Sequence, residues 1–173
     1  MANGFLIPLV LFVACVVVRD FYELLKQGGK IDLENKLIFA AIFASMCVLW
    51  ASWFTLCPAD PLPIELPGLI RWSGLAIVVL GGLVAVGALI QLRGVENIDH
   101  LVTSGLFKTF RHPMYLGFIS WIVGWSIYHG AMVSLAVGFL GIASVLWWMR
   151  LEDARLAKQF GNRYSEYLET TWF

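Results

Sequence analysis

The sequence predicts an all-α integral membrane protein with about five transmembrane helices, the last two of which form a tight helical hairpin. Two observations carry this prediction. The 173 residues are 60% hydrophobic and only 14% charged, whereas soluble domains carry about 25% charged residues. The apolar residues also gather in runs near the ~20 residues that a membrane-spanning helix needs.

Charge and cysteine content exclude several other classes of protein. Twelve Lys and Arg balance twelve Asp and Glu, and a nucleic-acid-binding domain would show a basic excess. An intrinsically disordered chain would have low hydrophobicity and a high net charge, and this chain has neither. Cys15, Cys47 and Cys57 are widely spaced, so we expect small buried thiols in place of a disulfide framework or a zinc site.

We expect one membrane domain over residues 1–173, with three spanning helices in residues 1–92. These helices are predicted at about residues 4–25, 37–56 and 69–92. Four prolines in residues 57–67 predict a loop between the second and third helices, because proline lacks the amide hydrogen and fixes its φ angle.

Residues 93–173 hold the predicted hairpin and a polar tail. The two arms of the hairpin are expected at about 114–128 and 131–149, joined at Gly130. The first arm is short for a full membrane span. Small residues form one face of the first arm and another face of the second, which favours close packing of the two arms. We expect the amphipathic tail from Arg150 onward to lie on the membrane or to fold back onto the protein.

The basic residues predict an orientation. In a five-helix arrangement all of the twelve Lys and Arg except Arg71 fall on one side. Because basic loops stay in the cytoplasm, we expect the N-terminus outside and the C-terminus inside. The brevity of the chain favours a prokaryotic inner membrane.

Polar residues gather in residues 96–115 and 150–167, at the two ends of the predicted hairpin. The hairpin returns both stretches to one membrane face, so Arg111, His112 and Tyr115 are expected near Arg150, Glu152 and Asp153. Charged residues at the edge of a span usually have a partner or a function. The spacing of the histidines and Glu152 fits no metal-ligand pattern, so no metal is expected.

Residues 100–117 read HLVTSGLFKTFRHPMYLG, and residues 152–153 and 161–167 read ED and GNRYSEY. These two blocks around a short apolar hairpin resemble the signature of the isoprenylcysteine carboxyl methyltransferase family, a superfamily that includes phospholipid N-methyltransferases. The resemblance covers residues 95–167. The family often has Pro-Tyr in place of Leu106-Phe107 and a second Glu in place of Asp153, so a phenolic hydroxyl is lost and one carboxylate is shorter.

The resemblance implies S-adenosylmethionine (SAM) as the methyl donor. Its ammonium group needs a carboxylate, its carboxylate needs Arg, His or amide donors, and its sulfonium needs an aromatic face or oxygens. By resemblance, the cofactor-binding residues are His100, Leu101, Val102, Gly105, His112, Pro113, Tyr115 and Glu152.

The residues leave the acceptor open, as a small or lipidic carboxylate, amine or thiol. A carboxylate acceptor is ionised at neutral pH and needs only a cation, for which Arg111 and Arg150 are the candidates. An amine or thiol must lose a proton, and His112 or Glu152 would then be the base. Besides the acceptor, the lipid bilayer is the expected partner, with neither nucleic acid nor an obligate protein. A membrane reductase on a related scaffold and a non-catalytic membrane subunit are the alternatives.

Overall fold

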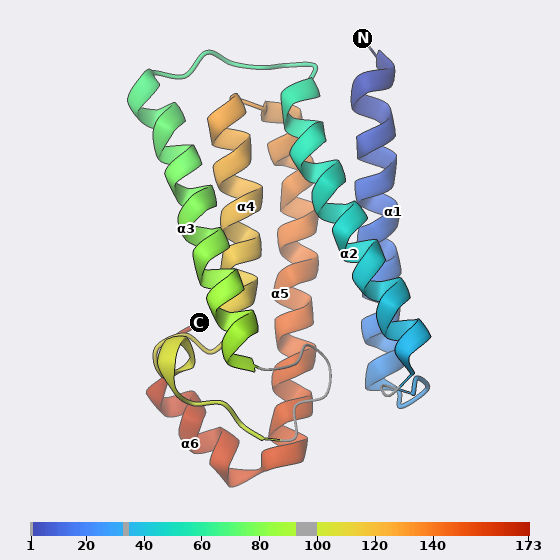
Figure 1. Ribbon diagram of the computed structural model, residues 1–173, viewed down its shortest axis with the longest axis vertical. Coiled ribbons are helices and arrows are strands. Elements are labelled where there is room, and N and C mark those ends of the chain that lie inside the picture. Colours follow the sequence, from blue (N-terminus) through green and yellow to red (C-terminus); the bar gives the residue numbers. More distant parts are fainter. Residues whose placement is uncertain (1, 33–34, 93–99) are drawn as a thin grey trace.

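The computed structural model describes residues 2–32, 35–92 and 100–173 (Figure 1). Helices α1 to α5 stand side by side, and the short helix α6 lies across one end of the bundle. The helices are α1 (Ala2–Gln27), α2 (Lys36–Leu56), α3 (Gly68–Leu92), α4 (Pro113–His129), α5 (Met132–Phe160) and α6 (Asn162–Thr170), with 3-10 turns η1 (Cys57–Ala59) and η2 (Gly105–Lys108).

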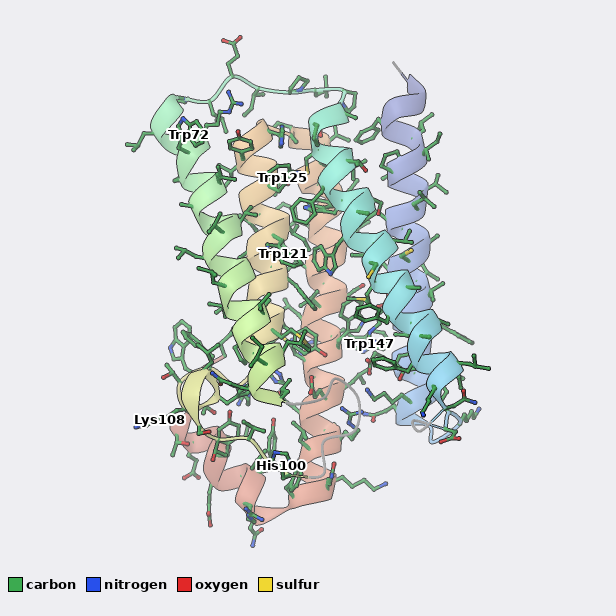
Figure 2. The ribbon with its side chains drawn as sticks, viewed as in Figure 1. Trp72, His100, Lys108, Trp121, Trp125 and Trp147 are labelled. Atoms are coloured by element: carbon green, nitrogen blue, oxygen red, sulfur yellow. The ribbon has the colours of Figure 1, made fainter. Side chains whose placement is uncertain are left out.

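The two ends of the bundle differ in character. We name the end that holds residues 100–112 and α6 the polar end; His100 and Lys108 mark it in Figure 2. The opposite end holds the start of α1, the proline-rich loop and the turn between α4 and α5 (Figure 1). In that turn Gly130 adopts a left-handed φ of 62°, which glycine reaches without a steric penalty.

Four helices of the described part of the chain are long and apolar enough to cross a membrane: α1, α2, α3 and α5. The predicted all-α membrane fold is therefore confirmed. The expected first hairpin arm, α4, has 17 residues and spans about 25 Å at 1.5 Å per residue. This length is below the ~30 Å of a bilayer core, in line with the expectation of a short first arm, and α4 carries the chain from the polar end back to the opposite end of the bundle (Figure 1).

The last long helix extends farther than expected. We expected its end near Met149, where the apolar run ends, but α5 continues to Phe160. No glycine or proline interrupts residues 142–160, so the backbone keeps its helical hydrogen bonds outside the apolar region. Gly161, with a φ of 55°, ends the helix and turns the chain into α6. The tail thus folds back onto the protein, which was one of the two expected outcomes.

The small-residue face of α4 packs against α3, not against α5 as expected. A Cβ atom added to Gly117 would meet the carbonyl oxygen of Gly81 at 2.5 Å, and one added to Gly124 would meet that of Gly74 at 2.6 Å. The two backbones are therefore in direct contact, which only residues without side chains allow. The expectation failed because α3 carries glycines at matching positions, and a backbone seam needs small residues on both helices.

The small face of α5 instead receives large side chains from three helices. Gly138 leaves room for Ile122 of α4 and Trp53 of α2, and Gly141 leaves room for Phe12 of α1. Phe12, Trp53 and Ile122 are almost fully buried and belong to one apolar cluster. This cluster joins α1 and α2 to the α4–α5 pair.

Changing Gly117 to Ala should weaken the α3–α4 seam. The added methyl group meets backbone atoms that have no rotamer to adopt, and overpacking of this kind costs about 1–3 kcal/mol of unfolding free energy. Thermal unfolding in detergent, followed by tryptophan fluorescence, measures the loss. Gly4→Ala is the matched control, because nothing lies within 4 Å of that position. Equal melting temperatures for both variants would contradict the seam.

Candidate functional site

A small cavity at the polar end contains most of the residues singled out in the sequence. Its walls come from the end of α3, the segment 100–112 and the facing turns of α4, α5 and α6. They comprise Leu92, Leu101, Val102, Phe107, Arg111, His112, Pro113, Met114, Tyr115, Glu152, Leu156 and Tyr167.

The carboxylate of Asp153 organises this end of the bundle. Its Oδ1 atom lies 2.7 Å from Nε2 of His112 and accepts a hydrogen bond of 2.5 Å from the Tyr164 hydroxyl. The guanidinium Nε of Arg111 lies 3.6 Å from the same oxygen. One side chain of α5 thus links the start of α4 to α6.

His112 is held from both sides of its ring. Its side chain is almost completely buried, and Nδ1 lies 3.9 Å from the Glu152 carboxylate while Nε2 faces Asp153. Its backbone N–H and that of Arg111 both donate to the carbonyl oxygen of Phe173, at 3.0 and 2.8 Å. Pro113 then begins α4 without an amide hydrogen to satisfy.

Tyr115 of α4 is buried and lines the small cavity together with Glu152. Its ring lies 5.6 Å from that of His112, at an angle of 53°. The site therefore presents a carboxylate, an imidazole and a phenol to one small volume.

Three residues that position the site were not among the expected cofactor-binding or catalytic residues: Asp153, which was expected only to lie near His112, and Tyr164 and Tyr167. The Tyr167 hydroxyl donates to the carbonyl of Phe107 at 2.6 Å and so holds η2 against α6. Burial, and after it the hydrogen bond to Asp153, raise the pKa of Tyr164, so its phenol stays a proton donor. The signal for these residues was present, since they fill the acidic pair and both tyrosine positions of the second block.

The structure brings seven of the expected site residues into the cavity wall and leaves three outside it. Those in the wall are Leu101, Val102, Arg111, His112, Pro113, Tyr115 and Glu152. His100 and Arg150 are exposed. Gly105 lies in the η2 turn with a φ of 63°, and an added Cβ would meet the Gln91 side chain at 2.6 Å. Its place is explained by backbone geometry.

A second, larger cavity adjoins the first and is almost wholly apolar. It has a volume of about 420 Å³, within the ~300–1,000 Å³ typical of small-molecule sites. Met114 and Tyr115 line both cavities. The remaining wall is Arg19, Phe43, Met46, Cys47, Trp50, Phe54, Ala85, Val86, Leu89, Phe118, Trp121 and Trp148. Trp121 lies near the middle of the bundle in Figure 2.

The model of the phospholipid methyltransferase family matches residues 69–163, more than half of the chain. The chain belongs to the phospholipid methyltransferase family. The matched residues include α3, α4, α5 and both motif blocks up to Arg163, so the family match contains most of the small cavity.

Several relatives are named as isoprenylcysteine O-methyltransferases. The protein-S-isoprenylcysteine O-methyltransferase of Schizosaccharomyces pombe is 37% identical over 78 residues, which are 42% of this chain and 31% of the relative. Form B from Arabidopsis thaliana is 29% identical over 110 residues, 56% of this chain and 54% of the relative. The Tribolium castaneum protein-S-isoprenylcysteine O-methyltransferase is 29% identical over 118 residues, which are 58% of this chain and 41% of the relative. The alignments thus span between a third and about half of the relatives' length. No solved structure matches this chain.

Burial raises the pKa of Tyr167 to about 12. Its phenol therefore stabilises the fold fully below about pH 10, its ordinary pKa, and this contribution is lost as the pH rises from 10 through 12. We expect a tyrosinate absorbance titration of the folded protein to show a step near pH 12 that is missing in Tyr167→Phe. Tyr128→Phe, at the opposite end, is the matched control. A step near pH 12 that persists in Tyr167→Phe would contradict the assignment.

Proposed function

We propose that this protein is a SAM-dependent membrane methyltransferase that transfers a methyl group to an acceptor with an apolar chain. The supporting observation is the meeting of two cavities at Tyr115. The smaller has Arg111, His112 and Glu152 among its largely apolar walls, and the larger has mainly apolar and aromatic walls, so a water-soluble donor and a lipidic acceptor can approach a common wall.

The residues of the small cavity fit the chemical groups of SAM. Glu152 offers a carboxylate to the ammonium group, and the buried Nε of Arg111, which no described residue hydrogen-bonds, is a donor for its carboxylate. Leu101, Val102 and Leu156 provide apolar walls for the adenine. Tyr115 provides an aromatic face for the sulfonium.

The small cavity has a volume of only about 40 Å³, an order of magnitude below that of ordinary small-molecule sites. SAM is much larger than this cavity. Its binding therefore requires the wall formed by residues 101–107 to move outward. The hydrogen bond between Tyr167 and the Phe107 carbonyl is one contact that such a movement would stretch. The closed wall excludes water from the reacting groups.

The chemistry that SAM supplies when bound is an electrophilic methyl group on a cationic sulfur. The protein then has to orient the two reactants in line and keep water out. Asp153 and Glu152 lie at the two ring nitrogens of His112, at 2.7 and 3.9 Å, and fix the orientation of the ring. For a carboxylate acceptor no base is needed, whereas for an amine or thiol acceptor His112 and Glu152 are the groups placed to take the proton.

We further propose that the polar end faces the cytoplasm. Ten basic residues of the described segments lie toward this end, while Arg71 lies at the other end, and cytoplasmic loops are enriched in Lys and Arg. The methyl donor, SAM, then reaches the small cavity directly from the cytoplasm. An acceptor with an apolar chain enters the larger cavity from the bilayer.

Titration of the detergent-solubilised protein with S-adenosylhomocysteine in a calorimeter tests the cofactor assignment. We expect saturable binding by the native chain and a loss of about tenfold or more in affinity for Glu152→Gln, because a charge-assisted hydrogen bond to the ammonium is removed. Glu166→Gln is the matched control, since Glu166 is exposed on α6 and lies outside both cavities.

The same titration separates the competing functions. Unchanged affinity in Glu152→Gln would contradict the placement of the cofactor. Absence of binding by folded native protein would contradict the methyltransferase itself, and titration with a nicotinamide cofactor would then test the reductase alternative.

A further inference from the structure

We propose that a hollow at the opposite end of the bundle binds the head group of a phospholipid that carries a phosphate and a primary ammonium. The hollow has a volume of about 410 Å³, and its wall includes Ile64, Glu65, Arg71, Tyr128, His129 and Gly130. It shares no residue with either of the cavities assigned to the methyl donor and acceptor. This inference does not depend on the proposed methyltransferase function.

Two segments distant in sequence build the hollow. The backbone N–H of Ile64, in the proline-rich loop, donates to the carbonyl oxygen of Gly130 at 2.9 Å. A Cβ atom added to Gly130 would collide with the carbonyl oxygen of Ile64, so the two backbones are in direct contact. The loop is thus held against the turn between α4 and α5, and the first turn of α3 contributes Arg71 beside them.

Arg71 is the exception to the distribution of basic residues in this chain. Lys and Arg gather on the cytoplasmic side of membrane proteins, and Arg71 lies at the opposite end from the polar segments. Its guanidinium carbon lies 5.0 Å from the centroid of the Tyr128 ring, and no ion pair joins it to a described carboxylate. A guanidinium over an aromatic ring keeps N–H donors for the forked binding of a phosphate.

Glu65 places the opposite charge in the same hollow. Its side chain is exposed, and it forms no hydrogen bond or ion pair with a described residue. A cation and an anion that share a hollow without pairing match a ligand that carries both charges. A phosphoethanolamine head group has this pattern, because its phosphate suits Arg71 and its ammonium N–H groups suit Glu65.

His129 adds a polar atom that the described part of the chain leaves unsatisfied. Its Nε2 atom is buried and has no hydrogen-bond partner there, although buried polar atoms nearly always have one. The packing of Arg71 on Tyr128 explains neither this atom nor the carboxylate of Glu65. A bound head group, or water held with it, supplies a partner for His129.

The level of the hollow in the membrane favours a lipid over a soluble molecule. Arg71 lies in the first turn of α3, whose apolar span begins at Gly68. Leu69 and Trp72 flank it and are 87% and 60% exposed, and tryptophan is enriched at the level of lipid head groups. Figure 2 shows Trp72 at this end of α3. The acyl chains can therefore lie along Leu69 and Trp72 while the head group enters the hollow.

Thermal unfolding of the full chain in dodecylmaltoside micelles tests this site, because a ligand of the folded state raises the melting temperature. The probes are dihexanoyl phosphatidylethanolamine, phosphatidylcholine and phosphatidylglycerol at equal mole fractions. We expect the native chain to bind the ethanolamine lipid about threefold more tightly than the others, since exposed charge pairs have effects of this size. The choline group has no N–H to donate, and the glycerol head group has no cation. Soluble O-phosphoethanolamine should stabilise the chain less than the lipid does.

Two variants separate the contributions of the two charges. Glu65→Gln should bind the ethanolamine and choline lipids equally, and Arg71→Met should lose affinity for all three phosphates. Both side chains are exposed, so we expect both variants to fold, and unfolding without lipid verifies this. Glu166→Gln and Lys158→Met make the same charge changes at exposed positions of the polar end and should keep the preference.

Equal responses of the native chain to the three lipids would overturn the proposal. An ethanolamine preference that survives both Glu65→Gln and Arg71→Met would do the same. Full stabilisation by O-phosphoethanolamine would overturn the assignment to a lipid. Since these measurements use neither SAM nor a methyl acceptor, their failure leaves the methyltransferase proposal untouched.

Discussion

The polar end of the bundle depends on the hydrogen bonds and ion pairs of the Asp153 carboxylate. This carboxylate joins α5 to two other segments, since His112 and Arg111 precede α4 and Tyr164 belongs to α6. Hydrogen bonds to an ionised acceptor are about twice as strong as neutral ones. A single oxygen with these partners therefore sets the direction of the His112 ring and the position of α6 together.

That interaction requires a helix that continues beyond the apolar region. Glu152 and Asp153 follow the apolar run of α5, and the continuing helix holds them at a fixed distance beyond the end of that run. Had the chain ended its helix at Met149, these carboxylates would lie on a loop without a defined distance to α4. The long α5 is thus the support for the site, and the glycine at 161 turns α6 back to close it.

The sequence predicts the class of fold well, and it predicts that residues of the two motif blocks lie together, because hydrophobic runs and motifs are local properties. It predicts helix partners poorly. The small residues of α4 show that a close seam exists, but matching glycines on α3, not on α5, decide where it forms. Likewise, a charge count identifies Arg111 and Arg150 as cations near the site, whereas only the packing of α1 brings Arg19 to the larger cavity.

The lengths of the helices explain why two cavities meet where they do. Because His112 contacts the acidic pair of α5, α4 begins level with Glu152, while α5 continues for eight residues to Phe160, about 12 Å at 1.5 Å per residue. The extra length of α5 supports residues 100–112 and α6 (Figure 1), which contribute walls of the small cavity. On the side of that level away from α6, the described residues that line the larger cavity all belong to helices, whose backbone groups pair within the helix, so an apolar cavity is tolerated there. Tyr115, in the first turn of α4, stands at the boundary, where a polar and an apolar reactant can each stay in its own medium.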